Sequence, residues 1–345
     1  MGIFFEEDIR QIITTDKINW NQFSNSVVFV TGATGIIGGA IVSVLSAANT
    51  FHNLSMQIIA HGQNLAKGQQ LTEKYDIKFV RGDIRNPLPI TDITNHIDYI
   101  FHCASITQSA DMVSKPIDVM TIAVEGTKNV LNLAKEQQCK SFVYLSSMEV
   151  YGQIFGEIRE SSLGYLDLSS PRTSYPESKR FCESLCIAYG KQYDAPVKIA
   201  RLSLTFGAGT ANDPTNRRVP LQFARKAISK EDIILHTKGE SVINCCYTAD
   251  VIMGLIIILL NGKNGEAYNI ANPAATVTVK EMANTVAQVL GNGKSSVVIN
   301  IPEDAEKYGY APATKIHLNV DKLKALGWIP KYGLDEMYQR MIADW

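Results

Sequence analysis

Tyr175 and Lys179 form the pair of side chains whose chemistry is easiest to predict from this sequence. They are four positions apart, so on a helix they share one face. A phenol has a pKa of about 10, too high for a base at neutral pH, but a nearby ammonium group stabilises the phenolate and lowers that pKa. The pair therefore predicts an acid/base centre for hydride transfer at an alcohol carbon. Taken alone, the same spacing also fits an exposed helix pair.

Ser147 and Glu149 follow the apolar run SFVYL at positions 141–145. At the end of a strand, the Ser147 hydroxyl can donate a hydrogen bond to a substrate oxygen. Glu149 could move a proton at a sugar carbon or orient the sugar. A strand-end glutamate held in a salt bridge is the alternative interpretation.

A glycine-rich segment, TGATGIIGG, occupies positions 31–39 and follows a short apolar β run. Its glycines allow a tight turn, a close approach to a pyrophosphate and close packing of helix on strand, while the helix N-terminus offers free N–H groups. A tight turn without a ligand is the alternative. The segment predicts dinucleotide contacts from Gly32, Thr34, Gly35, Ile36, Ile37 and Gly38.

The residues themselves leave the choice between NAD and NADP open. The second predicted strand ends in Ala60-His61-Gly62-Gln63-Asn64, with neither a carboxylate for the ribose 2′-hydroxyl nor an arginine for a 2′-phosphate. His61 is expected either to touch the adenosine ribose or to face solvent. Asp83 follows the third strand and could accept a hydrogen bond from the adenine amino group, or it could form a helix cap or turn.

Strands and helices alternate along the first two thirds of the chain. Apolar β runs are predicted at 26–31, 57–60, 77–81, 99–102, 141–145 and 197–201, and helices at about 36–48, 121–137 and 172–193. This order predicts an α/β fold, a Rossmann-type doubly wound parallel sheet with its ligand crevice at the carboxyl ends of the strands.

The same pattern divides the chain into segments. Residues 1–24 are expected to form an N-terminal extension with helical character and residues 25–205 an NAD(P)-binding domain. Residues 206–345 are expected to form mainly a smaller C-terminal α/β substrate lobe, with 244–268 returning to the first domain. The apolar run Val251–Leu260 is about half the roughly 20 residues of a membrane span, so a buried core helix is expected.

Composition excludes several classes of function. The 345 residues carry a net charge of −1, which gives no bulk attraction to nucleic acid or to an anionic membrane. None of the six cysteines forms a CxxC pair, so no metal site is expected, and reduced thiols favour a cytoplasmic location.

Several motifs occur together in an order that resembles one enzyme family. GDI at 82–84, HCAS at 102–105, SSMEVYG at 146–152 and YPESK at 175–179 follow the glycine-rich segment. With these motifs the chain resembles the extended short-chain dehydrogenase/reductases, and within them the NAD-dependent sugar-nucleotide epimerase/dehydratase family. The segment from 321 to 345 is similar to the closing segment of those enzymes. The resemblance covers roughly residues 25–345.

This resemblance implies further site residues and partners. Further cofactor contacts are implied for Asp83, Ile84, Cys103, Ala104, Ser105, Tyr175, Lys179, Leu202 and Ser203. Substrate contacts are implied for Thr107, Ser147, Met148, Glu149, Arg218 and Val219. The implied cofactor is NAD or NADP, with NAD slightly preferred, and the implied substrate is a nucleotide sugar. Relatives pair through two long helices, which implies a homodimer built on 121–137 and 172–193.

Two positions depart from the family pattern. Met148 stands where dehydratase relatives carry an aspartate, which disfavours 4,6-dehydration. Ile243 stands where relatives often carry an arginine that binds a phosphate, and charge-assisted contacts of that kind are strong. Arg217, Arg218 and Lys238 are candidates to replace it. Alternatively, the substrate is not a standard UDP- or dTDP-sugar.

Three functions remain to be compared. The leading hypothesis is an epimerase/dehydratase-type isomerase or lyase that oxidises the sugar C4 to a transient ketone, in the synthesis of surface polysaccharide or other glycan precursors. The alternative is a net NAD(P)H-dependent reductase or dehydrogenase of a keto-sugar or other carbonyl compound. A non-catalytic nucleotide sensor is the third, and the intact Ser147, Tyr175 and Lys179 argue against it.

Overall fold

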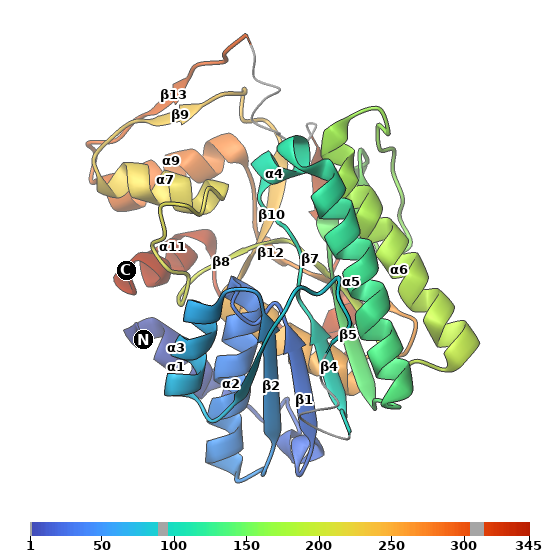
Figure 1. Cartoon of the computed structure of the whole chain (residues 1–345). Coiled ribbons are helices and arrows are strands. Elements are labelled where there is room, and N and C mark those ends of the chain that lie inside the picture. The colour runs from blue at the N-terminus through green and yellow to red at the C-terminus, as the bar shows by residue number, and fades with distance from the viewer. Residues whose placement is uncertain (1, 89–95, 304–313) are drawn as a thin grey trace.

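A seven-stranded parallel sheet forms the centre of the molecule (Figure 1), in a computed structural model that describes residues 2–88, 96–303 and 314–345. The strand order is β11-β7-β5-β4-β1-β2-β3. The strands are β1 Val27–Thr31, β2 Gln57–Gly62, β3 Lys78–Arg81, β4 Tyr99–His102, β5 Ser141–Ser147, β7 Val197–Leu202 and β11 Ala267–Ile270. The predicted Rossmann-type parallel sheet is confirmed.

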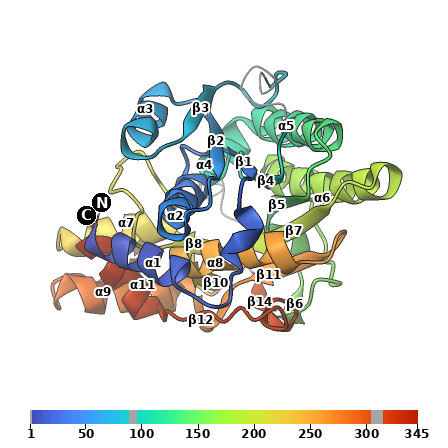
Figure 2. The ribbon, with the colours of Figure 1, turned by 90° about the horizontal axis from the view of Figure 1, so that it is seen from below.

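Helices cover both faces of this sheet (Figure 2). They are α2 Ile36–His52, α3 Leu65–Lys74, α5 Pro116–Glu136, α6 Ser174–Tyr193 and α8 Thr248–Asn261; the short helix α4 Ser109–Ser114 lies next to α5 and the turn before α6. Alternate residues of β1 point to opposite faces, because successive side chains of a strand alternate. Val28 and Val30 join the apolar cluster under α2 and α8, while Phe29 joins the cluster under α5 and α6. The apolar run Val251–Leu260 lies within α8, which packs against β5 and β7 as a core helix.

Two helices begin at other residues than the sequence pattern predicted. α5 starts at Pro116, five residues before 121, because proline suits the first turn of a helix and Asp118 lies favourably near the positive end of the helix dipole. α6 starts at Ser174, and the residues before it, Pro171–Thr173, form a short 3₁₀ turn (η3).

A second, mixed sheet lies beside the first, with the order β12-β10-β14-β6 and β8 paired to β10. Its strands are β6 Phe155–Ile158, β8 Leu204–Phe206, β10 Val242–Tyr247, β12 Asn272–Thr278 and β14 Lys315–Leu318; β9 Ile233–Leu235 and β13 Val297–Ile299 pair separately. Its helices are α7 Val219–Ile228, α9 Val279–Gly291, α10 Asp321–Lys324 and α11 Leu334–Ala343. The chain passes between the sheets repeatedly, since β6 precedes position 205 and α8 and β11 follow it. The domain division, with 244–268 returning to the first domain, stays a prediction.

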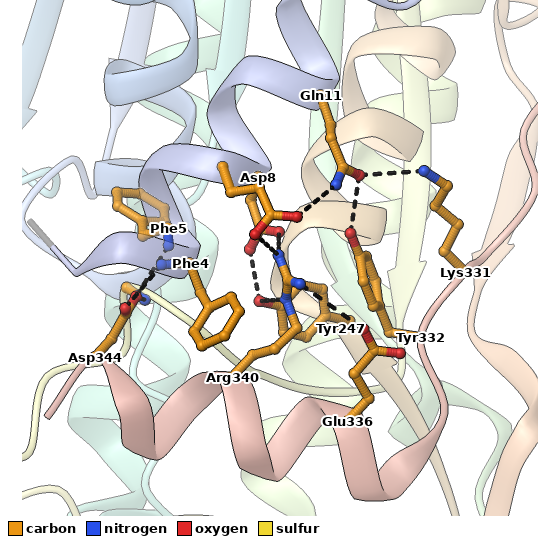
Figure 3. A network of polar contacts seen from close by, with 12 residues as sticks. Phe4, Phe5, Asp8, Gln11, Tyr247, Lys331, Tyr332, Glu336, Arg340 and Asp344 are labelled. Atoms are coloured by element: carbon orange, nitrogen blue, oxygen red, sulfur yellow. Dashed lines mark hydrogen bonds and ion pairs between the residues drawn. The ribbon is translucent and has the colours of Figure 1, made fainter.

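The N-terminal segment forms helix α1, Ile3–Ile13, and a 3₁₀ turn, η1 Trp20–Phe23. Figure 3 shows how α1 is tied to α11 and β10. Arg340 donates to the buried Asp8 carboxylate over 2.6 Å, and the Tyr247 hydroxyl donates to the other Asp8 oxygen over 2.5 Å. The Asp344 carboxylate accepts the N–H groups of Phe4 and Phe5 at the start of α1, which is where a negative charge stabilises a helix. α1 also packs on α2, so it braces the two halves of the molecule.

Among the residues that the structure describes, no helix has the length and apolar character that crossing a membrane requires.

Replacing Arg340 with methionine is expected to lower the free energy of unfolding by about 3 kcal/mol, because Asp8 is then left buried without its cation. Urea denaturation measures the change. Arg10→Met removes an exposed arginine of α1 and serves as the control. Equal stability of the two variants would contradict a stabilising role for the buried pair.

Candidate active site

The turn between β1 and α2 brings backbone directly against backbone. Gly32 has a φ of +65°, and a Cβ placed on it would lie 2.8 Å from the Ala104 nitrogen. A Cβ on Gly38 would lie 2.4 Å from the Gly32 carbonyl oxygen. Gly35 precedes the first turn of α2 and has no capping side chain, so N–H groups of that turn are left for a ligand.

A cavity of about 2300 Å³ extends from this turn to the second sheet. It brings together all the predicted site residues except Asp83. Those that line it are Gly32, Thr34, Gly35, Ile36, Ile37, Gly38, His61, Ile84, Cys103, Ala104, Ser105, Thr107, Ser147, Met148, Glu149, Tyr175, Lys179, Leu202, Ser203, Arg218 and Val219.

Asp83 makes a turn instead of lining this cavity. Its carboxylate accepts the backbone N–H of Arg85 over 3.0 Å and forms an ion pair with the Arg85 guanidinium over 2.6 Å. These bonds hold the pKa of Asp83 below its ordinary value. The turn interpretation, one of the two left open by the sequence, describes how this carboxylate is bound, while Gly82 and Ile84 on either side of it line the cavity. The adenine contact of Asp83 stays a prediction.

A buried hydrogen-bond chain fixes the segment after β4. The Thr31 hydroxyl accepts N–H groups from Cys103 and Ala104 and lies 2.8 Å from His102 Nδ1. His102 Nε2 lies 3.1 Å from the Thr127 hydroxyl. Burial lowers the pKa of His102 to about 3, so the ring is neutral and acts as a spacer between β1 and α5. These hydrogen bonds hold the segment from Cys103 to Ser105 against the glycine-rich turn.

Tyr175 and Lys179 are buried on one face of α6. The Lys179 ammonium group donates to the Leu145 carbonyl over 2.8 Å and lies 5.8 Å from the centre of the Tyr175 ring. Burial lowers the pKa of Lys179 to about 8. The sequence predicted that Lys179 lowers the pKa of Tyr175. In the structure the Lys179 ammonium group donates its hydrogen bond to the Leu145 carbonyl of β5.

The pKa of Tyr175 depends on several neighbours. It is raised to about 12, mainly by burial and in addition by the charge of Glu149. A hydrogen bond with Ser147 and the charges of Arg172 and Arg218 act in the opposite direction. The cations that favour the phenolate therefore come from η3 and from the start of α7.

Arg172 belongs to the site but was not predicted from the sequence. It is buried in η3, and its guanidinium contacts both oxygens of Glu149, at 2.9 and 2.7 Å. It precedes Tyr175 by three positions, about one helical turn, and that spacing was the available signal. Glu149 thus has the salt bridge named as an alternative, yet its side chain stays 28 % exposed and lines the cavity.

Arg201 has a structural role. It forms an ion pair with Glu183 over 2.6 Å and donates to the Tyr151 hydroxyl and the Glu160 carbonyl. The next residues, Leu202 and Ser203, do line the cavity, and the buried Ser203 hydroxyl has no hydrogen-bond partner among the described residues.

The cavity lining also includes Ile243, Arg217, Arg218 and Lys238. The loop before α7 is held by Arg225, which donates to the carbonyls of Asp213 and Asn216. Arg218 therefore lies at the start of α7, directly after an anchored loop. Its side chain interacts electrostatically with that of Tyr175. In the described parts of the chain, no cluster of three or more His, Cys, Asp or Glu side chains could hold a metal ion.

The site as a whole fits a dinucleotide beside a hydroxyl-bearing substrate. The glycine backbone at Gly32 and Gly38 leaves no room for a Cβ, and His61 and Ser203, whose buried polar atoms have no partner among the described residues, belong to the lining of the same cavity. Ser147 and Tyr175 can donate and accept a proton at a substrate oxygen next to that surface.

Comparison with known proteins agrees with this geometry. The model of the NAD-dependent epimerase/dehydratase family matches residues 28–271, which confirms the resemblance carried by the motifs. UDP-glucuronic acid decarboxylase 6 of Arabidopsis thaliana is 27% identical over 93% of this chain and 89% of its own length. A human dTDP-D-glucose 4,6-dehydratase is 26% identical over 91% of this chain and 88% of its own length.

A solved structure extends the likeness to the fold. UDP-glucuronic acid 4-epimerase from Bacillus cereus, in complex with UDP-glucuronic acid and NAD, has a TM-score of 0.77 and 20% identity. The match covers 92% of this chain and 98% of the epimerase.

Replacing Gly38 with alanine tests the backbone contact. Its Cβ would lie 2.4 Å from the Gly32 carbonyl, so α2 must move away from the turn. We expect dinucleotide affinity to fall at least about tenfold and stability to fall by about 1–3 kcal/mol. Titration calorimetry and thermal unfolding measure the two effects. Gly333→Ala, where a Cβ meets open space, is the control, and unchanged affinity in Gly38→Ala would contradict the expectation.

Proposed function

We propose that this chain, which belongs to the NAD-dependent epimerase/dehydratase family, oxidises the C4 hydroxyl of a nucleotide sugar to a transient ketone. The observation that carries the proposal is the convergence of Tyr175, Ser147 and Glu149 in one cavity with the glycine-rich turn. The ketone then serves a change at the sugar ring, and the hydride is returned. The product leaves without net turnover of the cofactor.

Each side chain has a separate task in this scheme. Tyr175 takes the proton from the C4 hydroxyl, and Ser147 donates a hydrogen bond to the same oxygen. Arg172 and Arg218 favour the phenolate that this step needs. The nicotinamide dinucleotide, when bound, supplies the hydride acceptor; Gly32, Gly38 and the first turn of α2 would hold its phosphates, and Lys179 its nicotinamide ribose.

The step that follows oxidation depends on Glu149. A ketone at C4 acidifies the neighbouring C5–H or weakens the bond to a C5 carboxylate, so proton exchange or decarboxylation becomes accessible. Glu149 can move a proton there because its side chain reaches the cavity. Met148 offers no acid for a departing hydroxyl group, which argues against dehydration. The likeness to UDP-glucuronic acid decarboxylase 6 supports a uronic acid sugar as the first candidate substrate.

A net reductase of a keto-sugar is the second candidate. Ile243 lines the cavity in place of a phosphate-binding arginine, which weakens the argument for a standard UDP- or dTDP-sugar. Stoichiometric oxidation or reduction of the nicotinamide separates this activity from the epimerase/decarboxylase scheme.

Two exposed apolar side chains support a homodimer built on α5 and α6. Ile117 of α5 is 70% exposed and Phe181 of α6 is 53% exposed, while the two helices pack against each other. A second copy would cover these side chains with the same pair of helices, as in a four-helix interface. The six unpaired cysteines agree with a cytoplasmic location, where the activity would supply precursors for surface polysaccharide.

Tyr175→Phe is expected to lower product formation by about 10²- to 10⁴-fold, because the proton acceptor is removed. The protein is incubated with NAD⁺ and UDP-glucuronic acid, UDP-glucose or dTDP-glucose, and the sugars are followed by NMR and the nicotinamide by absorbance. Tyr193→Phe on the same helix is the control. A new sugar without accumulated NADH supports the proposal, whereas NADH formed one for one with product assigns the chain to the second candidate.

Phe181→Glu is expected to convert the homodimer to a monomer, since a charge would be buried at the centre of the α5–α6 surface. Light scattering coupled to size exclusion measures the mass. Ile329→Glu introduces the same charge at a residue of similar exposure, 55%, outside these helices. A monomeric wild-type chain would contradict the proposed assembly.

A further inference from the structure

The first turn of α1 is capped by Asp344, the residue at which α11 ends (Figure 3). Gly2, which precedes α1, has no side chain to cap the helix. Instead, one Asp344 oxygen accepts the N–H of Phe4 over 3.1 Å and the other accepts the N–H of Phe5 over 3.0 Å. A carboxylate at this place satisfies free N–H groups and lies at the positive end of the helix dipole. The start of α1 is therefore fixed to the end of α11.

The same carboxylate also binds the loop that follows β8. The oxygen that accepts the Phe5 N–H accepts the Gly209 N–H over 3.3 Å as well, and the Trp345 indole donates to the Thr210 carbonyl over 2.8 Å. Gly209 has a φ of +77°, and a Cβ on it would lie 2.6 Å from the Phe5 ring, so the loop backbone lies directly on α1. We call Phe5, Asp344 and Trp345 the clamp, because together they hold the start of this loop.

Loop 207–218 connects the clamp to two arginines of the cavity. It ends at Arg218, the residue before α7, and Arg217 and Arg218 both line the cavity. On the side of α7, Arg225 binds two backbone carbonyls of the loop. Most residues between 211 and 217 are exposed, so side-chain packing contributes little to the position of this stretch. The place of Arg218 therefore depends on the two attachments of the loop, at the clamp and on α7.

The Arg218 guanidinium is available to a ligand. It makes no hydrogen bond or ion pair within residues 2–88, 96–303 and 314–345, and its charge interacts with Tyr175. In the proposed function, Arg218 is a candidate to bind a phosphate in place of the arginine that is missing at Ile243. Such a contact is stronger when the loop is already fixed, because ordering a mobile loop would offset part of the binding free energy.

We infer that Asp344 and Trp345 are positioning residues for the sugar nucleotide, and that with α1 they hold loop 207–218 so that Arg218 stays in place for the substrate. The inference rests on the proposed function, in which Arg218 contacts the substrate. The hydrogen bonds that the described side chains of the clamp make go to α1 and to the loop, and not to the glycine-rich turn. The clamp is therefore expected to act on the sugar nucleotide and not on the dinucleotide.

Calorimetry on the full chain separates the two ligands. It measures the binding of NAD⁺, and then of UDP-glucuronic acid, UDP-glucose and dTDP-glucose to the NAD⁺-saturated protein. Asp344→Ala is expected to weaken the sugar nucleotide that the wild type binds best at least about tenfold, and to leave NAD⁺ within about threefold. Asp344→Asn keeps one acceptor oxygen and is expected to recover part of the loss. Asp335→Ala removes an exposed carboxylate of α11 and is expected to change neither affinity.

Trp345→Phe keeps the inference testable should Asp344→Ala fail to fold. It removes the N–H that donates to Thr210 and is expected to weaken the sugar nucleotide about three- to tenfold, again without an effect on NAD⁺. Unchanged sugar-nucleotide binding, or an equal loss of both ligands, would overturn the positioning role and leave the proposed function intact.

The wild-type chain distinguishes failure of the proposed function from failure of the inference. A wild type that binds a sugar nucleotide without converting it would remove the proposed function, and the variants would still decide the positioning role. A wild type that binds none of the three sugar nucleotides would remove both.

Discussion

Contact of backbone with backbone at Gly32 and Gly38 is the constraint on which the rest of the site depends. Because no Cβ fits at either position, α2 lies directly against the end of β1 and the segment after β4. The Thr31–His102–Thr127 chain then fixes that segment to α5. The glycines, the buried His102 imidazole and the start of α2 together form one side of the cavity. The reacting side chains lie on the other side, on α6 and β5.

On the side of the cavity formed by α6 and β5, burial and a few charged side chains set the pKa values of the reacting groups. Desolvation raises the pKa of Tyr175 and lowers that of Lys179, because burial disfavours the charged form of each group. Arg172 is shared between Glu149 and the phenol, and it couples the residue that would deprotonate C4–OH to the residue that would act on C5. The two steps of the proposed reaction are thereby linked through one guanidinium group.

The sequence predicted the parts of this molecule that depend on local pattern. Alternating apolar runs located the strands of the parallel sheet, and all the residues predicted for the site except Asp83 line one cavity, because the carboxyl ends of parallel strands meet at one edge. The ion pair of Asp83 with Arg85, two residues away, was not predicted, and the cofactor contact of Asp83 stays a prediction. Arg172 and the passage of β6 into the second sheet escaped prediction, since both depend on partners distant in sequence: Arg172 pairs with Glu149, and β6 pairs with β14.

The tie between α1 and α11 has a consequence for biosynthesis. Asp8 emerges from the ribosome early, but its partner Arg340 is made 332 residues later. Until Arg340 is made, α1 therefore cannot pair its buried carboxylate with that guanidinium, and its apolar face is covered first by α2 and later by α8. The nucleotide-binding half can fold as it is synthesised, whereas the loop at Gly209, which bonds Asp344, gains its support only after α11 is released. Support for the loop at Gly209 therefore comes later in synthesis than the completion of the glycine-rich turn.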